Sequence, residues 1–168
     1  MCQPHEVSDP VLDQLTALGV AHEIVPCDPA LADTAAFCEA YGYAADDSAN
    51  AIVVAGKADP RRYVCCLVLS SARLVVNGTV RKTLGVRKAS FASGDETREL
   101  TGMEIGGVTP FGLPDGLPIW IDAAVMTRDR VIVGGGSRDR KILCPPAALA
   151  AIPGATVVDG LAKPPPPD

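Results

Sequence analysis

The sequence predicts a single α/β (α+β) domain, with a mixed, mostly antiparallel β-sheet or partial barrel and flanking helices. Three observations support this prediction. The chain has 168 residues, which suits one domain with a core of its own. Its residues are 48% hydrophobic, and the apolar ones fall in short runs. Helix and strand patterns alternate irregularly with hairpin connections, which disfavours a strictly parallel, doubly wound sheet.

The first third of the chain predicts two helices and one strand. Asp9 and Pro10 are typical of a helix N-cap and first turn. Apolar residues then recur at helical spacing until Gly19, which is expected to end the helix. Residues 22–25 are expected to form a short strand, and Thr34 is expected to cap a second helix.

The middle of the chain predicts a hairpin followed by a short helix. Residues 49–55 and 62–69 are apolar runs of the length and composition of buried strands, and residues 56–60 connect them. Asn77 is expected to cap a short helix that ends at Gly85.

Shorter elements fill the remainder. A strand is expected over 87–92, and Ser93 and Glu96 have the spacing of a capping box that opens a helix to about residue 100. The later elements are expected to be strands at 117–122, 130–133, 140–143 and 155–158 and a helix at 145–151. We expect one domain over 1–160, and a proline-rich, disordered tail over 161–168.

Composition restricts the location and the partners. The first nine residues lack a signal peptide's basic and apolar regions, and no apolar run approaches the ~20 residues that span a bilayer, so we expect a cytoplasmic protein without a membrane partner. The formal net charge of −5 argues against binding long DNA by bulk charge. Arg81, Lys82, Arg87 and Lys88 nevertheless form a local basic cluster that can contact one end of an RNA.

The cysteines and histidines do not indicate a metal site. Six cysteines include no C-x-x-C pair, and the chain has two histidines, so no metal is expected. Cys65 and Cys66 are adjacent in a strand pattern and should point to opposite faces as buried thiols.

The loop over residues 101–114 combines four glycines with two prolines. Within it, Gly106 to Pro110 form a Gly-x-x-x-Pro element. Glycine permits a close approach by a ligand, and proline fixes the backbone and removes a competing donor. Such a loop can hold a small ester or amino acid on main-chain groups, without a metal.

Several blocks occur in an order that is similar to a known family. They are Ala49 to Val54, Leu84 to Ala92, Glu99 to Leu113, Pro118 to Asp122, Val133 to Arg138 with Lys141, and Val157 to Asp159. Together they resemble the YbaK/prolyl-tRNA-synthetase-associated domain family, which includes free-standing aminoacyl-tRNA editing proteins. The resemblance extends over almost the whole chain up to about residue 159.

This resemblance implies hydrolysis of the ester that joins a wrong amino acid to the 3′ end of a tRNA. It implies that the loop from Gly106 to Pro110, including Gly107 and Thr109, lines the aminoacyl pocket. A bound water would attack the ester carbonyl, and backbone N–H groups would stabilise the oxyanion, so no cofactor is expected. The amino acid removed is expected to be small, and the partner is the tRNA acceptor end.

One residue departs from the family pattern. Many members have a lysine where this chain has Asn50, which can donate a hydrogen bond but carries no charge. Main-chain groups and water then do the chemistry, or another cation substitutes, or the protein is a binding module without turnover. The substitute cations considered are Lys57, Lys82, Lys88 and Lys141.

A second set of residues is expected to bind the RNA end. Gly134 and Gly135 begin a three-glycine run whose N–H groups can cradle a phosphate, although such a run is also typical of a flexible hairpin. Lys141 follows this run and is placed to neutralise a terminal phosphate. Lys82 and Lys88 complete the expected RNA-binding set.

Overall fold

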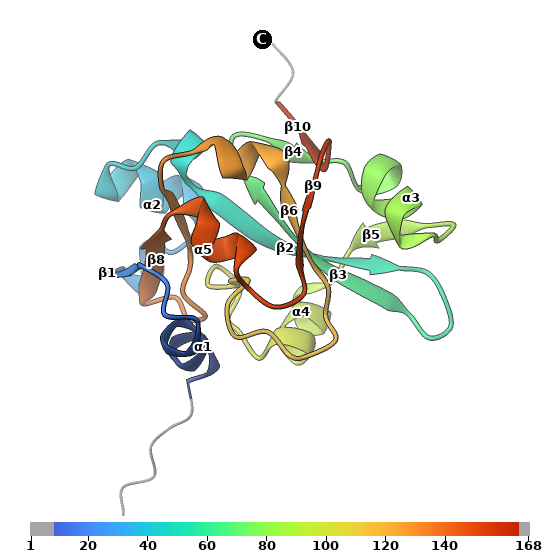
Figure 1. Ribbon diagram of the computed structural model, residues 1–168, viewed down its shortest axis with the longest axis horizontal. Coiled ribbons are helices and arrows are strands. Elements are labelled where there is room, and N and C mark those ends of the chain that lie inside the picture. The colour runs from blue at the N-terminus through green and yellow to red at the C-terminus, as the bar shows by residue number, and fades with distance from the viewer. Residues whose placement is uncertain (1–8, 165–168) are drawn as a thin grey trace, which may run out of the picture.

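Three β-sheets and five α-helices make up the computed structural model of this chain, which describes residues 9–164 (Figure 1). The α-helices are α1 (Pro10–Leu18), α2 (Thr34–Tyr41), α3 (Arg81–Leu84), α4 (Gly94–Thr101) and α5 (Pro146–Ala150). The strands are β1 (Glu23–Pro26), β2 (Ala49–Gly56), β3 (Arg62–Leu69), β4 (Arg73–Leu74), β5 (Ala89–Phe91), β6 (Ile119–Asp122), β7 (Val131–Gly134), β8 (Arg140–Cys144), β9 (Ala155–Val158) and β10 (Ala162–Lys163).

The largest sheet has five strands in the order β5-β2-β3-β6-β9. The predicted hairpin is present, with β2 antiparallel to β3. Strand β5 adds antiparallel to the far end of β2, whereas β6 and β9 run parallel to β3. The sheet is therefore mixed, and the predicted class is confirmed.

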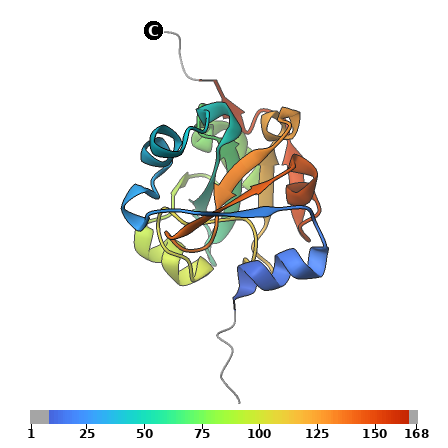
Figure 2. The ribbon, with the colours of Figure 1, turned by 90° about the vertical axis from the view of Figure 1, so that its left-hand side faces the viewer.

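A second sheet, in the order β1-β8-β7, is antiparallel throughout and crosses close to the start of β2. Figure 2 shows β1 passing in front of β8 and β7, with α1 and α2 on either side. A single bridge between Ser48 and Ile132 joins the two sheets. Beyond this bridge the sheets diverge.

The two faces of the large sheet carry separate apolar cores. Cys65, Leu67 and Ile121 point into one core, and Cys66 and Val68 point into the other. Both cysteines are fully buried, as the strand pattern predicted. Burial raises the pKa of Cys65 to about 12, so this thiol stays protonated and packs as an apolar group.

Local hydrogen bonds explain where two helices begin. The Asp9 carboxylate accepts from Leu12 N at 3.2 Å, and this bond caps α1. Ser93 Oγ accepts from Glu96 N at 3.0 Å, and Glu96 Oε1 accepts from Ser93 N at 3.3 Å. These two bonds form the predicted capping box of α4.

The prediction of a helix capped by Asn77 was wrong in its first half. Residues Val76–Val80 form a π-helical turn, and the α-helix covers only Arg81–Leu84. The wider turn buries Val80 fully in the core, and Val80 N donates to Val75 O at 3.1 Å. Burial of Val80 in the core thus determines the backbone here, and the predicted N-cap at Asn77 does not form.

The boundary predicted at residue 161 also needs correction. Leu161 is fully buried, and β10 pairs antiparallel with β4. Asp122 Oδ1 accepts from Ala162 N at 3.4 Å, and burial raises the pKa of this carboxyl. The fold therefore continues to Lys163, because an apolar side chain anchors the segment before the prolines. Residues 165–168 of the predicted tail lie outside the described residues.

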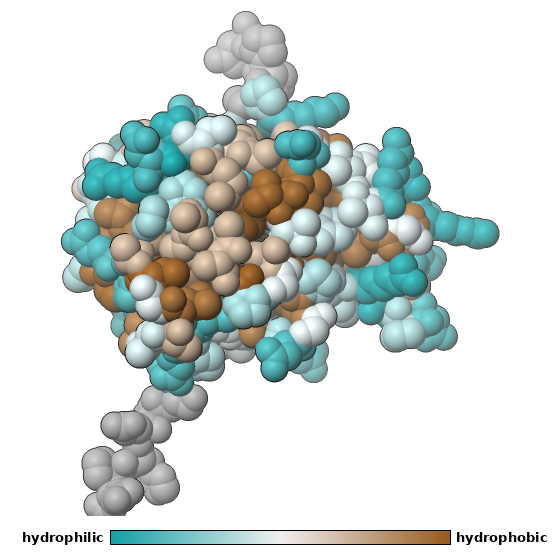
Figure 3. All heavy atoms as spheres, in the orientation of Figure 1, coloured by the Kyte–Doolittle hydropathy of each residue, from teal (hydrophilic) through white to brown (hydrophobic). Residues whose placement is uncertain are grey.

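The surface is uneven in polarity. Hydrophilic side chains project at the end of the molecule that carries α3 and the β2–β3 hairpin (Figure 3). None of the helices in residues 9–164 has the length and apolar character that crossing a membrane requires.

Candidate active site

A cavity of about 290 Å³ lies between the first half of β2, α2, the loop before residue 109 and the ends of β7 and β8. The residues that line this cavity are Thr34, Phe37, Ser48, Ala49, Asn50, Ala51, Ile52, Val53, Ala92, Thr97, Ile105, Gly106, Val108, Ile132, Val133, Gly134 and Lys141. Four predicted site residues therefore meet here from distant parts of the chain: Asn50, Gly106, Gly134 and Lys141. We call it the β2 cavity.

The exposed edge of β2 supplies main-chain groups to the β2 cavity. Ser48 O accepts from Ser70 N on the β3 side, so odd-numbered residues of β2 direct their amides to the opposite edge. On that edge Val53 O accepts from Ala92 N at 2.9 Å, where β5 ends. Within residues 9–164, Ala51 has no ladder partner there, and its N–H and C=O face the cavity.

Asn50 is held by the first residue of α2. Thr34 Oγ1 donates to Asn50 Oδ1 at 2.6 Å. This bond occupies the carbonyl end of the Asn50 amide and leaves Nδ2 as a donor, without an acceptor among the described residues. Asn50 therefore presents a fixed, neutral N–H donor to the cavity.

Lys141 is the cation of the β2 cavity. Its side chain is buried, and Nζ donates to Ala32 O at 2.6 Å and to Gly106 O at 2.8 Å. The ammonium also lies 5.5 Å from the centre of the Phe37 ring. An ammonium has three donors, so one N–H remains after these two bonds.

No carboxylate in residues 9–164 forms an ion pair with Lys141. Burial is the main reason why the pKa of Lys141 is lowered from its ordinary value of 10.5. A buried positive charge without a carboxylate partner favours the approach of an anion or of a developing oxyanion.

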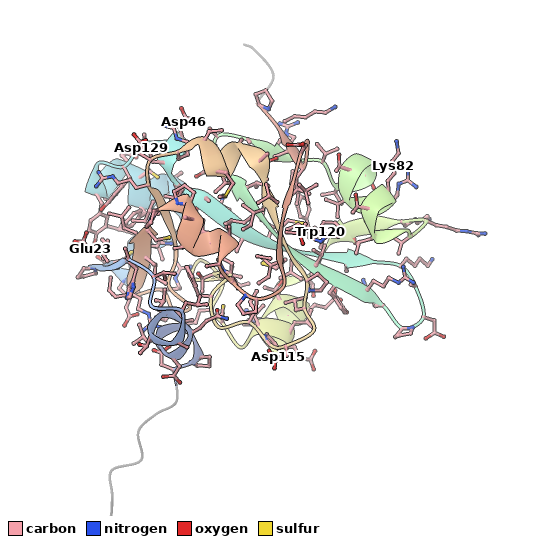
Figure 4. All side chains as sticks on the ribbon, in the orientation of Figure 1. Glu23, Asp46, Lys82, Asp115, Trp120 and Asp129 are labelled. Carbon is pink, nitrogen blue, oxygen red and sulfur yellow. The ribbon has the colours of Figure 1, made fainter. Side chains whose placement is uncertain are left out.

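The other lysines considered as substitutes do not line the β2 cavity. Lys57 and Lys88 lie at the far end of β2 and beside β5, where they line a separate groove. Lys82 extends from α3, at the opposite end of the molecule from α2 (Figure 4). Of the four lysines considered, the structure brings only Lys141 into the cavity with Asn50.

Arg138 clamps the loop that forms one wall of the cavity. Its Nη1 donates to Ile105 O at 2.7 Å and to Asp33 Oδ1 at 3.2 Å. Its main-chain N donates to Glu104 Oε2 at 2.9 Å. Gly106 adopts φ +90°, and a Cβ there would overlap the Arg138 guanidinium. Glycine at 106 therefore allows both the turn and the clamp.

The rest of the Gly-x-x-x-Pro element lies behind this wall. Gly107 N donates to Glu104 O at 2.9 Å, and Gly107 O accepts from Gly136 N at 2.6 Å, so neither group is free for a substrate. Thr109 is fully buried, and its Oγ1 has no hydrogen-bond partner among the described residues. Pro110 is buried as well. The structure gives Gly107, Thr109 and Pro110 a supporting position rather than a surface in the cavity.

The three-glycine run packs against this same loop. A Cβ on Gly134 would overlap the Val108 carbonyl oxygen, and a Cβ on Gly135 would lie 2.7 Å from Arg140 O. Gly135 O accepts from Arg140 Nε at 2.7 Å. Close backbone approach explains these glycines, and Gly135 is not part of the cavity lining.

Sequence reasoning missed three residues that shape the site: Thr34, Phe37 and Arg138. Phe37 is fully buried and stacks on Tyr41 and Tyr43, with centroids 4.7 and 5.4 Å away. The prediction that Thr34 caps the second helix was wrong, because Asp33 occupies the N-cap position and the Thr34 hydroxyl bonds Asn50 instead. Phe37 is an apolar residue of the predicted helix, and its type alone does not show that it lines a site. Arg138 carried a signal, because it lies in a block that resembles the family.

The site can position a carbonyl and stabilise negative charge. It combines a buried ammonium, a fixed amide donor and free main-chain groups with apolar walls. The described residues contain no group of three or more His, Cys, Asp and Glu side chains arranged to hold a metal ion.

Comparisons with known proteins identify the family and the fold. The sequence profile of the aminoacyl-tRNA editing domain family matches residues 28–152. The curated protein YwhH of Bacillus subtilis, which is uncharacterised, is 34% identical over 87 residues. That match covers 52% of this chain and 55% of YwhH, so it spans about half the length of each protein.

Two solved structures share the fold. A candidate trans-editing enzyme for prolyl-tRNA synthetase is 25% identical with a TM-score of 0.77, over 94% of this chain and 99% of that one. The hypothetical protein APE2540 is 21% identical with a TM-score of 0.82, over 92% of this chain and 100% of its own.

Proposed function

Because this chain belongs to the aminoacyl-tRNA editing domain family, we propose that it is a trans-editing deacylase that hydrolyses the ester of a mischarged tRNA. The observation that carries the proposal is the β2 cavity, where Asn50 and Lys141 converge beside the free edge of β2. Its partner is the acceptor end of an aminoacyl-tRNA, and its place of action is the cytoplasm.

The reaction follows from the groups in the cavity. A water oxygen attacks the ester carbonyl carbon, and the carbonyl oxygen becomes an oxyanion. Asn50 Nδ2 and the remaining N–H of Lys141 donate to this oxyanion and stabilise the negative charge as it develops. The ester C–O bond then breaks, and the ribose oxygen takes the proton that the water gave up. The products are a free amino acid and a tRNA with a free terminal hydroxyl.

In this proposal Lys141 compensates for the uncharged Asn50. Asn50 supplies direction, because Thr34 fixes its amide, and Lys141 supplies charge. The same lysine bonds Gly106 O and so links the charge to the position of the Gly-x-x-x-Pro loop.

The size of the cavity supports a small amino acid as the substrate. Its volume of about 290 Å³ lies just below the range of ~300–1,000 Å³ for sites that hold drug-sized ligands. Phe37, Ile52 and Ile132 contribute apolar walls. Such walls exclude larger side chains by overlap, so selection acts by size.

A deacylation assay over a panel of mischarged tRNAs tests the proposal. We expect release of one or a few small amino acids at micromolar enzyme, and little release from correctly charged tRNAs. The variant Lys163→Met changes an exposed lysine that does not line the β2 cavity, so it should hydrolyse the same substrates as the wild type and serves as the control. Absence of hydrolysis for every tRNA in the panel would refute the proposal.

The alternative is a binding module that recognises an aminoacyl-tRNA end or an amino acid without turnover. The observation that favours it is Asn50 itself, where the family resemblance implies a lysine. The variant Asn50→Lys separates the two functions. Gain of hydrolysis from an inactive wild type indicates a binding module, whereas loss of existing activity indicates that Asn50 is an adapted residue of an enzyme.

A further inference from the structure

Basic residues are concentrated in one part of this acidic chain. Residues 57–88 contain eight of the fifteen Lys and Arg residues and only one acidic residue, Asp59. This segment includes the β2–β3 hairpin end, α3 and the turn into β5, which carry seven of the eight basic residues; the eighth, Arg73, is on β4, beyond the other end of β3. The rest of the molecule is therefore strongly negative, and an anionic partner would be directed to this end.

Two of these lysines lie directly opposite each other. The register of β2 and β5 pairs Gly56 with Ala89, and the next pair is Lys57 with Lys88. Lys57 N donates to Lys88 O at 2.9 Å and so fixes the two residues side by side. No carboxylate in residues 9–164 forms an ion pair with either lysine. Like charges placed opposite each other destabilise a strand pair unless an anion lies between them.

These lysines line a groove of about 660 Å³ at the end of the sheet. Arg61, Asn77 and Ser90 contribute further donors to the same groove. Arg61 is partly engaged, because its Nη1 lies 3.6 Å from Glu96 Oε2. We call this the basic groove; its donors suit phosphate oxygens.

An exposed aromatic side chain lies between the basic groove and the β2 cavity. Phe91 is 59% exposed, which is unusual for a large apolar residue at a sheet edge. It pairs with Val54 across the strands, so it shares a sheet face with Asn50 and Ile52 of the cavity. Ala89, which lines the basic groove, is on this face as well, whereas the same alternation places Lys57 and Lys88 with Ala55 and Ser90 on the other face, so the groove extends around the sheet edge from one face to the other.

Strand geometry gives the length of this path. From Asn50 to the position opposite Phe91 is four residues of β2, or about 13 Å at ~3.3 Å per residue. The basic groove begins at Ser90, next to Phe91, and Lys88 is three residues from Phe91, or about 10 Å at the same rise. Stacked nucleotides rise ~3.4 Å each, so the path accommodates a few nucleotides of single strand.

We propose that the edge formed by β2 and β5 is a binding track for the single-stranded 3′ end of an RNA, with a base stacked on Phe91 and phosphates held by Lys57 and Lys88. This inference rests on the proposed function, because the track delivers the terminal aminoacyl group to the β2 cavity. A flat aromatic ring stacks on any base, and the paired lysines read only the backbone, so the track is tolerant of sequence.

RNA binding by the full chain tests the track without any need for catalysis. The probes are a fluorescent single-stranded RNA, the same RNA as a blunt duplex, and uncharged tRNA. Phe91→Ala should weaken binding of the single strand by about fivefold or more, and Phe91→Trp should restore it. Val157→Ala, on the opposite edge strand β9 and also exposed, is the matched control and should bind like the wild type.

The lysines have a distinct signature in salt. The double variant Lys57→Gln/Lys88→Gln should reduce the slope of log K against log salt concentration by about 1.4, since each single-strand phosphate contact contributes ~0.7. The double variant Arg130→Gln/Lys163→Gln removes the same charge from other exposed positions and should leave the slope unchanged.

Hydrolysis then separates the two proposals. Phe91→Ala and Lys57→Gln/Lys88→Gln should hydrolyse aminoacyl-tRNA more slowly than the wild type. Both should hydrolyse an aminoacyl-adenosine ester at the wild-type rate, because this small substrate does not reach Phe91. If the wild type cleaves neither substrate, the proposed function fails, while the binding data still decide on the track. The track is refuted if Phe91→Ala and the lysine variant bind RNA like the wild type, or if the duplex binds as tightly as the single strand. It is also refuted if Phe91→Ala leaves RNA binding unchanged and only converts a homodimer to a monomer, because Phe91 would then contact a second copy of the chain rather than a base.

Discussion

Replacement of Lys141 by methionine removes the cation of the β2 cavity but keeps an unbranched side chain. The ammonium donates to Ala32 O and Gly106 O, at 2.6 and 2.8 Å. Hydrogen bonds from a charged donor contribute ~1.5–3 kcal/mol each, so two of them amount to about 3–6 kcal/mol. The methionine variant no longer has the desolvation cost of a buried ammonium, and this gain offsets part of the lost hydrogen-bond energy. We expect Lys141→Met to lower the free energy of unfolding by about 2–4 kcal/mol.

The effect should depend on pH in a defined direction. The pKa of Lys141 is lower in the folded protein than its ordinary value of 10.5. Between these two values the unfolded chain holds a proton that the native protein lacks, so the stability of the wild type rises with pH in this window. Lys141→Met has no such group. The stability difference between the two proteins should therefore grow as pH increases toward 10.5.

Urea unfolding at several pH values measures this difference, with Lys163→Met as the exposed control. The m-value should be unchanged, so that a shift in midpoint reports stability alone. The reasoning is refuted if Lys141→Met is as stable as the wild type, or if the difference between them is the same at neutral and alkaline pH.

Three further predictions concern the cavity. Asn50→Asp keeps the acceptor for Thr34 Oγ1 but replaces the Nδ2 donor with a negative oxygen, so kcat/KM for deacylation should fall by about 10²–10³. Circular dichroism checks that the variant is folded, and an unchanged kcat/KM would contradict the role of Asn50. Gly134→Ala places a Cβ against the Val108 carbonyl oxygen and should cost ~1–3 kcal/mol of stability, measured by urea unfolding; a neutral effect would show that the loop yields freely. Phe37→Ala removes the ring that stacks on Tyr41 and Tyr43 and should cost ~3–5 kcal/mol by the same measurement; a loss below 1 kcal/mol would show that α2 is held by other contacts.

The local elements were predictable because their causes are local. The capping box at Ser93 and Glu96 depends on residues three positions apart, and the sequence shows both. The opposite orientation of Cys65 and Cys66 follows from strand alternation alone. The turn at Val76–Val80 was missed, since a single buried valine determined its geometry.

The candidate site was predictable in part. Asn50, Gly106, Gly134 and Lys141 were named from the resemblance to the family, and they share one cavity. The roles of the glycines were not predictable in detail, because a sequence does not show which carbonyl oxygen a Cβ would meet. Arg138, which clamps Asp33 to Ile105, contacts residues that lie 105 and 33 positions earlier in the chain.

The sequence by itself determined the class of the fold, the caps of α1 and α4, the buried strands and the family, because these depend on residue types at short spacing. Tertiary structure alone decided which lysine lines the β2 cavity. Lys57, Lys82, Lys88 and Lys141 are equivalent as letters, and only the crossing of the β1-β8-β7 sheet near the start of β2 carries Lys141 to Asn50. The same folding leaves Lys57 and Lys88 paired at the other end of β2, since strand register fixes neighbours that the chain separates by 31 residues.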